Sequence, residues 1–176
     1  TKMKRYFFNL IIMSLIASCS FQSAQLDYIK NFLTEEEDGK SPKKNWLIIW
    51  DELIVDLYAI NVGDQVVFAN EDMSIFFRNN QIYKVNGLSF IHKTIDIEKN
   101  NKILEYSLNN SRISVDICSD TEYLIEGNNE ILIQSCIGGL NQKIYQNKLT
   151  RNSEGMLTHL KFKVLPEYSP IILRMK

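Results

Sequence analysis

The side chains of this sequence best suited to chemistry are three cysteines and two histidines: Cys19, Cys118, Cys136, His92 and His159. A thiol can act as a nucleophile, bind a metal or form a disulfide, depending on its surroundings and its compartment. The sequence contains no C-x-x-C or H-x-x-x-H spacing and no G-x-S-x-G, Walker or G-x-G-x-x-G motif. We therefore expect a protein that is not an enzyme and that has no metal or cofactor, and we look for other roles for the cysteines.

Cys19 follows a segment with the layout of a secretory signal peptide. Residues 1–5 contain three basic side chains, and residues 6–16 form an apolar run that only one Asn and one Ser interrupt. A helix needs about 20 apolar residues to cross the hydrocarbon core of a bilayer, so this run is too short for a permanent transmembrane anchor. We expect residues 1–18 to be a cleaved lipoprotein signal peptide.

The segment ends in Ile16-Ala17-Ser18-Cys19, which resembles the bacterial lipobox. Small side chains before the cysteine fit a narrow protease site, and the Cys19 thiol is the nucleophile that receives a diacylglyceryl group. We expect cleavage after Ser18 and anchoring of Cys19 by acyl chains such as palmitate. Because Ser20 follows in place of Asp, the sorting rule of enteric bacteria favours a periplasm-facing site on the outer membrane. The alternative is a core helix that happens to contain Cys19.

Cys118 and Cys136 remain after Cys19 is assigned to the lipid. In an exported protein, an even number of thiols can pair, because the compartment is oxidising. A bridge between them would stabilise the fold by about 3 kcal/mol in the chain-entropy description. The alternative is two separate, small buried residues.

The phase of the expected strands suggests where these cysteines lie. Side chains alternate between the two faces of a strand, and in each strand one face is rich in isoleucine and valine. Those faces, which we expect to form the core, carry Ile113, Val115 and Ile117 in one strand and Ile131, Ile133 and Ile137 in the other. Both cysteines fall on the opposite, less apolar face, which indicates a bridge on the surface side between neighbouring strands.

The elements that must position these residues divide the chain at about residue 45. In residues 19–44, Leu26, Ile29, Phe32 and Leu33 recur at helical spacing, which predicts a lipid-anchored tether with a short helix. Residues 45–176 carry short apolar and β-branched runs separated by Asn, Asp and Gly, at the spacing of an antiparallel meander. We expect a mainly β, single domain that forms a sandwich or a half-open or complete barrel.

Three of these strands are predicted near residues 65–69, 73–78 and 81–85. Asn-rich segments predict the turns between these strands and between the later ones. Residues 46–60 fit either a strand pair bent at Asp51-Glu52 or a helix starting near Trp50. Residues 171–175 follow two prolines, which predicts an edge strand or one reached through an irregular turn.

Composition limits the classes of function. The chain has 176 residues, a formal net charge of −1 and 45% hydrophobic residues, as in ordinary globular proteins. Basic residues are scattered, whereas nucleic-acid binding needs a basic face. We therefore expect no nucleic-acid partner.

Aromatic residues gather near one predicted hairpin. They are Trp46, Trp50, Phe76, Phe77, Tyr83 and Phe90. Such residues usually pack in the core; the functional alternative is an apolar cavity or groove for a lipid or a glycan.

The same hairpin resembles a known family. Residues 73–88, MSIFFRNNQIYKVNGL, resemble a stretch of YjbF/GfcB-type bacterial lipoproteins, and the match is carried by Arg78, Asn79, Asn80, Ile82, Tyr83, Gly87 and Leu88. This resemblance implies a mainly β outer-membrane lipoprotein associated with exopolysaccharide or group 4 capsule export. It implies no catalytic residue.

Three functions follow from these observations. The first is a non-enzymatic envelope lipoprotein, accessory to exopolysaccharide or capsule export or to envelope assembly, with envelope or export proteins as partners. The second is a lipid or lipoprotein carrier, which predicts an apolar cavity in a half-open barrel. The third is an envelope hydrolase, which requires polar groups that converge on His92 or His159.

Overall fold

The computed structural model describes residues 45–88 and 93–176, which form antiparallel β-strands and no helix. The strands are β1 (Trp46–Trp50), β2 (Leu53–Val62), β3 (Gln65–Ala69), β4 (Ser74–Arg78), β5 (Gln81–Asn86), β6 (Thr94–Asn100), β7 (Ile103–Leu108), β8 (Ser111–Cys118), β9 (Glu122–Glu126), β10 (Asn129–Ile137), β11 (Ile144–Arg151), β12 (Leu157–Phe162) and β13 (Ile171–Met175). The mainly β prediction is confirmed. The signal peptide, the helix expected within residues 19–44, Phe90 and His92 lie outside the described residues.

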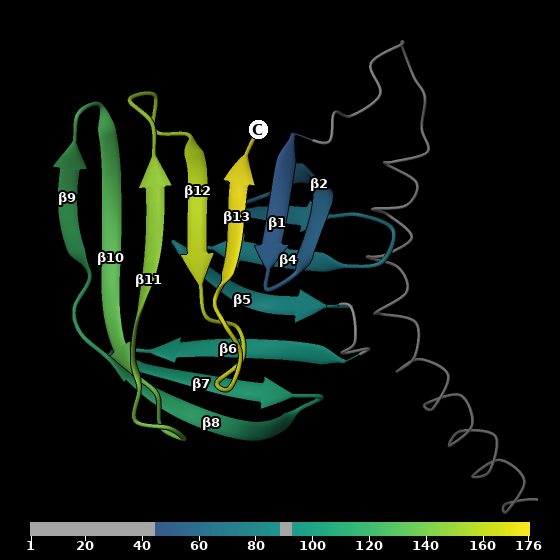
Figure 1. The fold of residues 1–176 in the computed structure, drawn as a ribbon, viewed down its shortest axis with the longest axis vertical. Coiled ribbons are helices and arrows are strands. Elements are labelled where there is room, and N and C mark those ends of the chain that lie inside the picture. Colours follow the sequence, from purple (N-terminus) through teal and green to yellow (C-terminus); the bar gives the residue numbers. More distant parts are fainter. Residues whose placement is uncertain (1–44, 89–92) are drawn as a thin grey trace, which may run out of the picture. The chain divides into compact units, whose positions relative to one another are not determined.

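The strands close into a barrel. Strands β1 to β8 pair in chain order, β8 pairs with β10, and β10 to β13 continue the ring back to β1, so that twelve strands form a closed circuit. The remaining strand, β9, pairs with the other half of β10. Figure 1 shows the barrel flattened into two layers: β9 to β13 and β1 run roughly vertically, and β4 to β8 cross behind them.

Asparagine pairs make several of the turns. Asn79 and Asn80 between β4 and β5 have φ of 52° and 62°, and Asn109 and Asn110 between β7 and β8 have φ of 49° and 65°. Two-residue hairpin loops of type I′ require positive φ at both positions, and asparagine tolerates this conformation better than most residues. The predicted turns and the three predicted strands near 65–85 are therefore confirmed.

The structure also answers the two open questions about the first and last strands of the domain. Residues 46–60 form the hairpin of β1 and β2, turning at Asp51 with φ 50°, so the strand-pair interpretation holds and the helix alternative does not. The predicted edge position of residues 171–175 is wrong, because β13 pairs with both β12 and β1. An irregular turn through Pro166 and Pro170 leads into it, as expected.

Aromatic and aliphatic side chains fill the interior. Trp46, Trp50 and Phe68 are buried, and the Trp46 and Phe68 rings lie 4.7 Å apart. The Trp50 Nε1–H donates a hydrogen bond to the Ser169 carbonyl oxygen at 2.9 Å, which satisfies its polar atom. Core packing therefore accounts for the two tryptophans.

One prediction of strand phase is wrong. In β8, Asp116 and Cys118 face the interior with 0% and 3% exposure, whereas Ile117 is 65% exposed. In β10, Cys136 is buried and Ile137 is 44% exposed, although Ile131, also expected in the core, is buried. The polar face of each strand turns inward because a disulfide and a hydrogen-bonded carboxylate occupy this end of the barrel.

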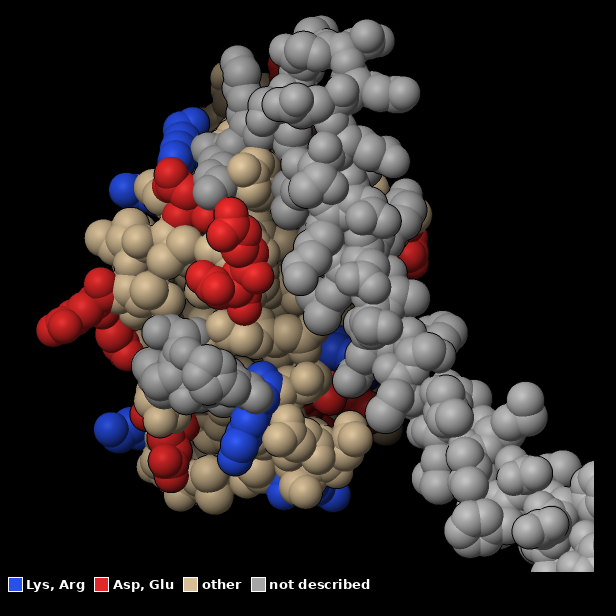
Figure 2. Space-filling view, turned by 90° about the vertical axis from the view of Figure 1, so that its right-hand side faces the viewer, with Lys and Arg blue, Asp and Glu red and all other residues tan. Residues whose placement is uncertain are grey.

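The outer surface carries charges of both signs. On the face shown in Figure 2, acidic and basic side chains of the described residues lie interspersed among uncharged ones.

Candidate functional site

The polar part of the interior begins at the seam, the short contact between β8 and β10. Only two residue pairs form the ladder there, Ile117 with Ile137 and Cys118 with Cys136. The Cys118 and Cys136 sulfurs are bonded at 2.06 Å, and both side chains are buried in the core. The disulfide is present as the sequence suggested, but on the inner face and not on the surface side.

Hydrogen bonds extend this seam. The Ser119 N–H donates to the Ser135 carbonyl oxygen at 2.8 Å, and the Gln134 Nε2 donates to the Ser119 carbonyl oxygen at 3.1 Å. Here β8 leaves β10, and β9 takes its place along β10 from Glu122 to Glu126. The barrel therefore splays at this position.

A fully buried carboxylate, Asp116, lies beside the seam. Its Oδ1 accepts hydrogen bonds from Ser114 Oγ at 3.1 Å and from the Gly139 N–H at 2.9 Å, and its Oδ2 accepts one from Tyr145 Oη at 2.7 Å. A buried charge is costly unless hydrogen bonds or an opposite charge compensate it. Three donors from β8, β11 and the β10–β11 turn supply this compensation.

Two tyrosines and a lysine extend the network. Tyr106 and Tyr145 share a hydrogen bond of 2.9 Å between their hydroxyls, and Lys163 Nζ lies 4.4 Å from the centroid of the Tyr145 ring. Burial raises the pKa of Tyr145, and the Tyr106 hydroxyl and Asp116 carboxylate raise it further. Burial also raises the pKa of Tyr106 and lowers that of Lys163. Both phenols therefore stay protonated and serve as donors.

The turn from β10 to β11 depends on glycine. A Cβ atom at Gly139 would lie 2.0 Å from the Val115 carbonyl oxygen, so only glycine allows the turn to approach β8 this closely. The adjacent Gly138 N–H donates to the Lys143 carbonyl oxygen at 2.9 Å. The glycine pair is a turn, as predicted, and its backbone N–H holds a carboxylate and not a phosphate.

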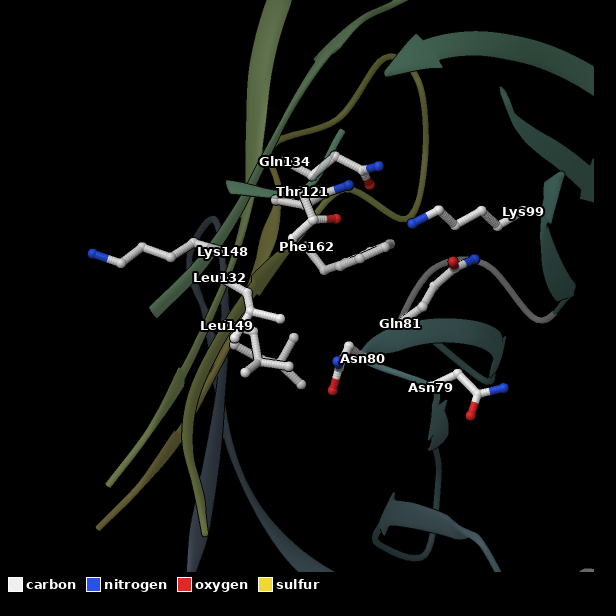
Figure 3. Close-up of a pocket in the computed structure, with 12 residues that line it drawn as sticks. Asn79, Asn80, Gln81, Lys99, Thr121, Leu132, Gln134, Lys148, Leu149 and Phe162 are labelled. Carbon is white, nitrogen blue, oxygen red and sulfur yellow. The ribbon is translucent and has the colours of Figure 1, made fainter. Parts of the chain in front are cut away.

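A cavity of about 210 Å³ lies next to the network, between the two layers of the barrel. Its lining comes from the β4–β5 turn and the start of β5, from β6, from the β8–β9 connection and from β10 to β12. The lining residues are Asn79, Asn80, Gln81, Lys99, Thr121, Leu132, Gln134, Asn147, Lys148, Leu149, Leu160 and Phe162. Figure 3 shows Lys99 reaching toward Gln134 and Phe162, whereas Lys148 points away. Amide groups, one ammonium and aliphatic carbons thus share the cavity wall.

This cavity suits a small polar molecule better than an acyl chain. Its volume is below the 300 to 1,000 Å³ typical of ligand pockets, and polar side chains interrupt its apolar wall. Its buried amides already have partners: Gln134 donates to Ser119, and Asn147 Oδ1 accepts from the Lys163 N–H at 3.0 Å. Among the described residues that line the cavity, none carries a carboxylate or an imidazole.

The remaining candidate, His159, lies apart from the cavity on the outer face of β12. It is half-buried, and burial together with Lys148, Lys161 and Arg174 lowers its pKa. Its cross-strand neighbours are Thr150 and Arg174. Within the described residues, no group of His, Cys, Asp and Glu has the geometry of a metal site.

The aromatic hairpin is a packed element. Phe76 and Phe77 are buried, and the Phe76 and Tyr83 rings are 6.0 Å apart. The Arg78 guanidinium lies 5.0 Å from the centroid of the Tyr83 ring, and Tyr83 donates a hydrogen bond to Gln65 Oε1. Arg78 therefore has intramolecular contacts, and this hairpin adds its Asn79-Asn80 turn and the following Gln81 to the cavity wall.

The network around Asp116 belongs to no catalytic or metal-binding motif of the sequence. The sequence nevertheless indicates it, because Ser114, Asp116 and Cys118 occupy every second position and therefore lie on the same face of one strand. If the disulfide is buried, the polar residues on the same strand face are buried with it. Buried polar groups need hydrogen-bond partners inside the protein.

The fold defined above is a closed, antiparallel β-barrel with an additional strand at its seam. No protein-family model matches this chain, and no curated protein matches it. Among solved structures, it is similar to the hypothetical lipoprotein YmcC from Escherichia coli (K12), with a TM-score of 0.55 and 11% sequence identity over 86% of this chain and 96% of that chain. At this identity the likeness establishes the shared fold alone. Residues 45–88 and 93–176 include no helix long and apolar enough to span a membrane.

Proposed function

We propose that this chain is a non-enzymatic lipoprotein of the bacterial envelope, anchored in the outer membrane through Cys19 and facing the periplasm. Its role is accessory, in exopolysaccharide or capsule export or in envelope assembly, with envelope or export proteins as partners. The observation that carries the proposal is the combination of a lipobox at Ile16-Ala17-Ser18-Cys19 with a fold shared with a lipoprotein.

The interior of the barrel supports a non-catalytic role. The Asp116 carboxylate has 0% exposure and its bonds are made within the protein, so a substrate has no access to it. Burial and the three cations Lys148, Lys161 and Arg174 lower the pKa of His159, so its surroundings disfavour the protonated form that a general base must reach. The disulfide fits the oxidising compartment of an exported protein.

The carrier alternative remains a second candidate, but the described cavity does not favour it. A carrier of acyl chains needs a long, apolar tunnel, and here the tryptophans Trp46 and Trp50 and the β-strand side chains fill the core. The cavity of about 210 Å³ has amides and an ammonium in its wall.

Deletion of the gene with complementation tests the proposed role. The deletion strain should lose most of its surface polysaccharide, and wild-type protein should restore it while Cys19→Ser does not. The variant Glu154→Gln, in an exposed turn of the barrel, is the control for expression and folding, and its level in membranes should equal that of the wild type. Full polysaccharide in the deletion strain, or full rescue by Cys19→Ser, would contradict the proposal.

A further inference from the structure

Four isoleucines form a continuous row across the outside of the barrel. Ile103 in β7 pairs with Ile117 in β8, Ile117 pairs with Ile137 in β10, and Ile137 pairs with Ile144 in β11. Their side chains are 43%, 65%, 44% and 75% exposed, in chain order. We call these four residues the isoleucine row. It crosses the seam directly outside the Cys118–Cys136 disulfide.

The exposed apolar residues are concentrated in one stretch of the chain. Of the eleven large hydrophobic residues that are exposed in the described chain, eight lie between positions 103 and 144. Single exposed hydrophobics are normal on any protein, but contiguous groups mark interaction sites. Leu140, 57% exposed in the adjacent turn, enlarges the apolar surface.

The surroundings of the row resemble the centre of a protein–protein interface. The next residues on the same face of β8, β10 and β11 are Ser119, Ser135 and Gln146, joined by hydrogen bonds of 3.2 and 3.3 Å. Two ion pairs lie near the row, Lys102 with Asp120 at 2.7 Å and Arg112 with Glu105 at 3.2 Å. Interface centres are depleted of charge, whereas surfaces that bind anionic membranes carry clusters of Lys and Arg.

We propose that the isoleucine row binds a second copy of this chain in a two-fold, face-to-face sheet contact. The row has two members on each side of the seam, so a two-fold axis between Ile117 and Ile137 places Ile103 of one copy toward Ile144 of the other. A two-fold interface uses the same surface on both copies and requires such self-complementarity. Sheets pack face to face in this way at a separation of about 10 Å.

Size and rigidity are consistent with this contact. The row with Leu140 offers a few hundred Å² of apolar surface, and the hydrogen-bonded polar rim extends it toward the ~800 Å² per partner of a standard interface. The disulfide fixes β8 against β10 beneath the row, so little ordering is needed on binding. Pairing of two copies through the β9 edge is less suitable, because symmetry about Leu124 would place Glu122 opposite Glu126.

Site-specific photo-cross-linking of the full chain in intact bacteria tests the proposal. p-Benzoylphenylalanine replaces Ile117, or Ile54 as the matched control, since both side chains are 65% exposed on outer faces and Ile54 lies outside the row. Illumination should give a product of twice the chain mass from position 117, containing peptides of this chain only, and little from position 54. Equal yields at both positions, no product, or products with lipid or another protein only would overturn the proposal.

A second pair of variants tests the same contact while the cross-linking residue stays at position 117. With p-benzoylphenylalanine at position 117, Ile137→Ser removes one aliphatic side chain from each copy. Self-association should weaken about a hundredfold, since each of the two losses costs at least ~1.4 kcal/mol. Ile54→Ser should leave the cross-linked fraction unchanged. An unchanged fraction in Ile137→Ser, with the disulfide intact, would also overturn the proposal.

Discussion

Cys118 and Cys136 face each other directly across the seam, and their disulfide covalently closes the ring of twelve strands where its ladder is shortest. Every other junction in the ring has at least three paired residues, as between β5 and β6. The barrel is thus held at its weakest junction by a bond that forms only under oxidising conditions. This relationship links the fold to the compartment proposed for the protein.

Removal of the disulfide should destabilise the barrel. We expect Cys118→Ala with Cys136→Ala to lower the free energy of unfolding by about 3 kcal/mol, because the unfolded chain gains the entropy of an open loop. Urea unfolding followed by tryptophan fluorescence measures this, since Trp46 and Trp50 are buried in the core. Reduced wild-type protein should match the variant, and equal stability of the oxidised and reduced forms would refute the prediction.

Neutralisation of the buried carboxylate should also weaken the seam. Asp116→Asn keeps the shape but loses charge-assisted bonds from Tyr145 and Gly139 and places an NH₂ group against a donor, at an expected cost of about 2 kcal/mol. Tyr145→Phe should cost about 1 kcal/mol by the loss of one donor. Glu154→Gln, in an exposed turn, is the control and should unfold like the wild type.

The two glycine substitutions Gly139→Ala and Gly127→Ala should differ in effect. Gly127 has φ of +61° and open space around its Cβ position, so its alanine variant should lose about 1 kcal/mol through conformation alone. Gly139→Ala meets the Val115 carbonyl oxygen and should lose more, about 3 kcal/mol, by displacement of the turn. Thermal unfolding of both variants checks the order, and a smaller loss for Gly139→Ala would show that the turn can move freely.

His159 should make stability depend on pH. Its pKa in the folded protein is below the ordinary 6.5, because burial and three cations oppose its charge. The unfolded chain therefore binds the proton first, and stability falls as the pH drops through 6.5 toward the folded-state pKa. Compared with wild type, His159→Gln should show a smaller decrease in Tm between pH 7 and about pH 5. Parallel decreases in the two proteins would contradict this assignment.

The turns and strands of this fold were predictable, whereas the inward face of two strands was not. Asn79-Asn80 and Asn109-Asn110 encode their turns locally, because few residues accept positive φ. In β8, alternation alone separates Ile117 from Cys118 but does not say which of them faces inward. That choice depends on Tyr145 and Gly139, which are distant in sequence and satisfy Asp116.

The position of β9 was equally beyond local prediction. A simple meander would place residues 121–126 between β8 and β10 and keep the two cysteines apart. Instead, β10 is long enough to pair with β9 through residues 129–133 and with β8 through Cys136 and Ile137. Because β10 is long, the β9–β10 hairpin and the Cys118–Cys136 disulfide can form together. The same pairing of β10 with β8 also places Ile117 beside Ile137 in the exposed isoleucine row.

The central claim, that Cys19 carries a lipid, is tested most directly by the mass of the protein extracted from membranes. We predict a chain that begins at Cys19 and carries a diacylglyceryl group and a further acyl chain, and that partitions into detergent. The Cys19→Ser variant should lack this added mass and leave the membrane fraction. An unmodified mass for the wild-type chain, or an identical mass shift and location for Cys19→Ser, would contradict the account.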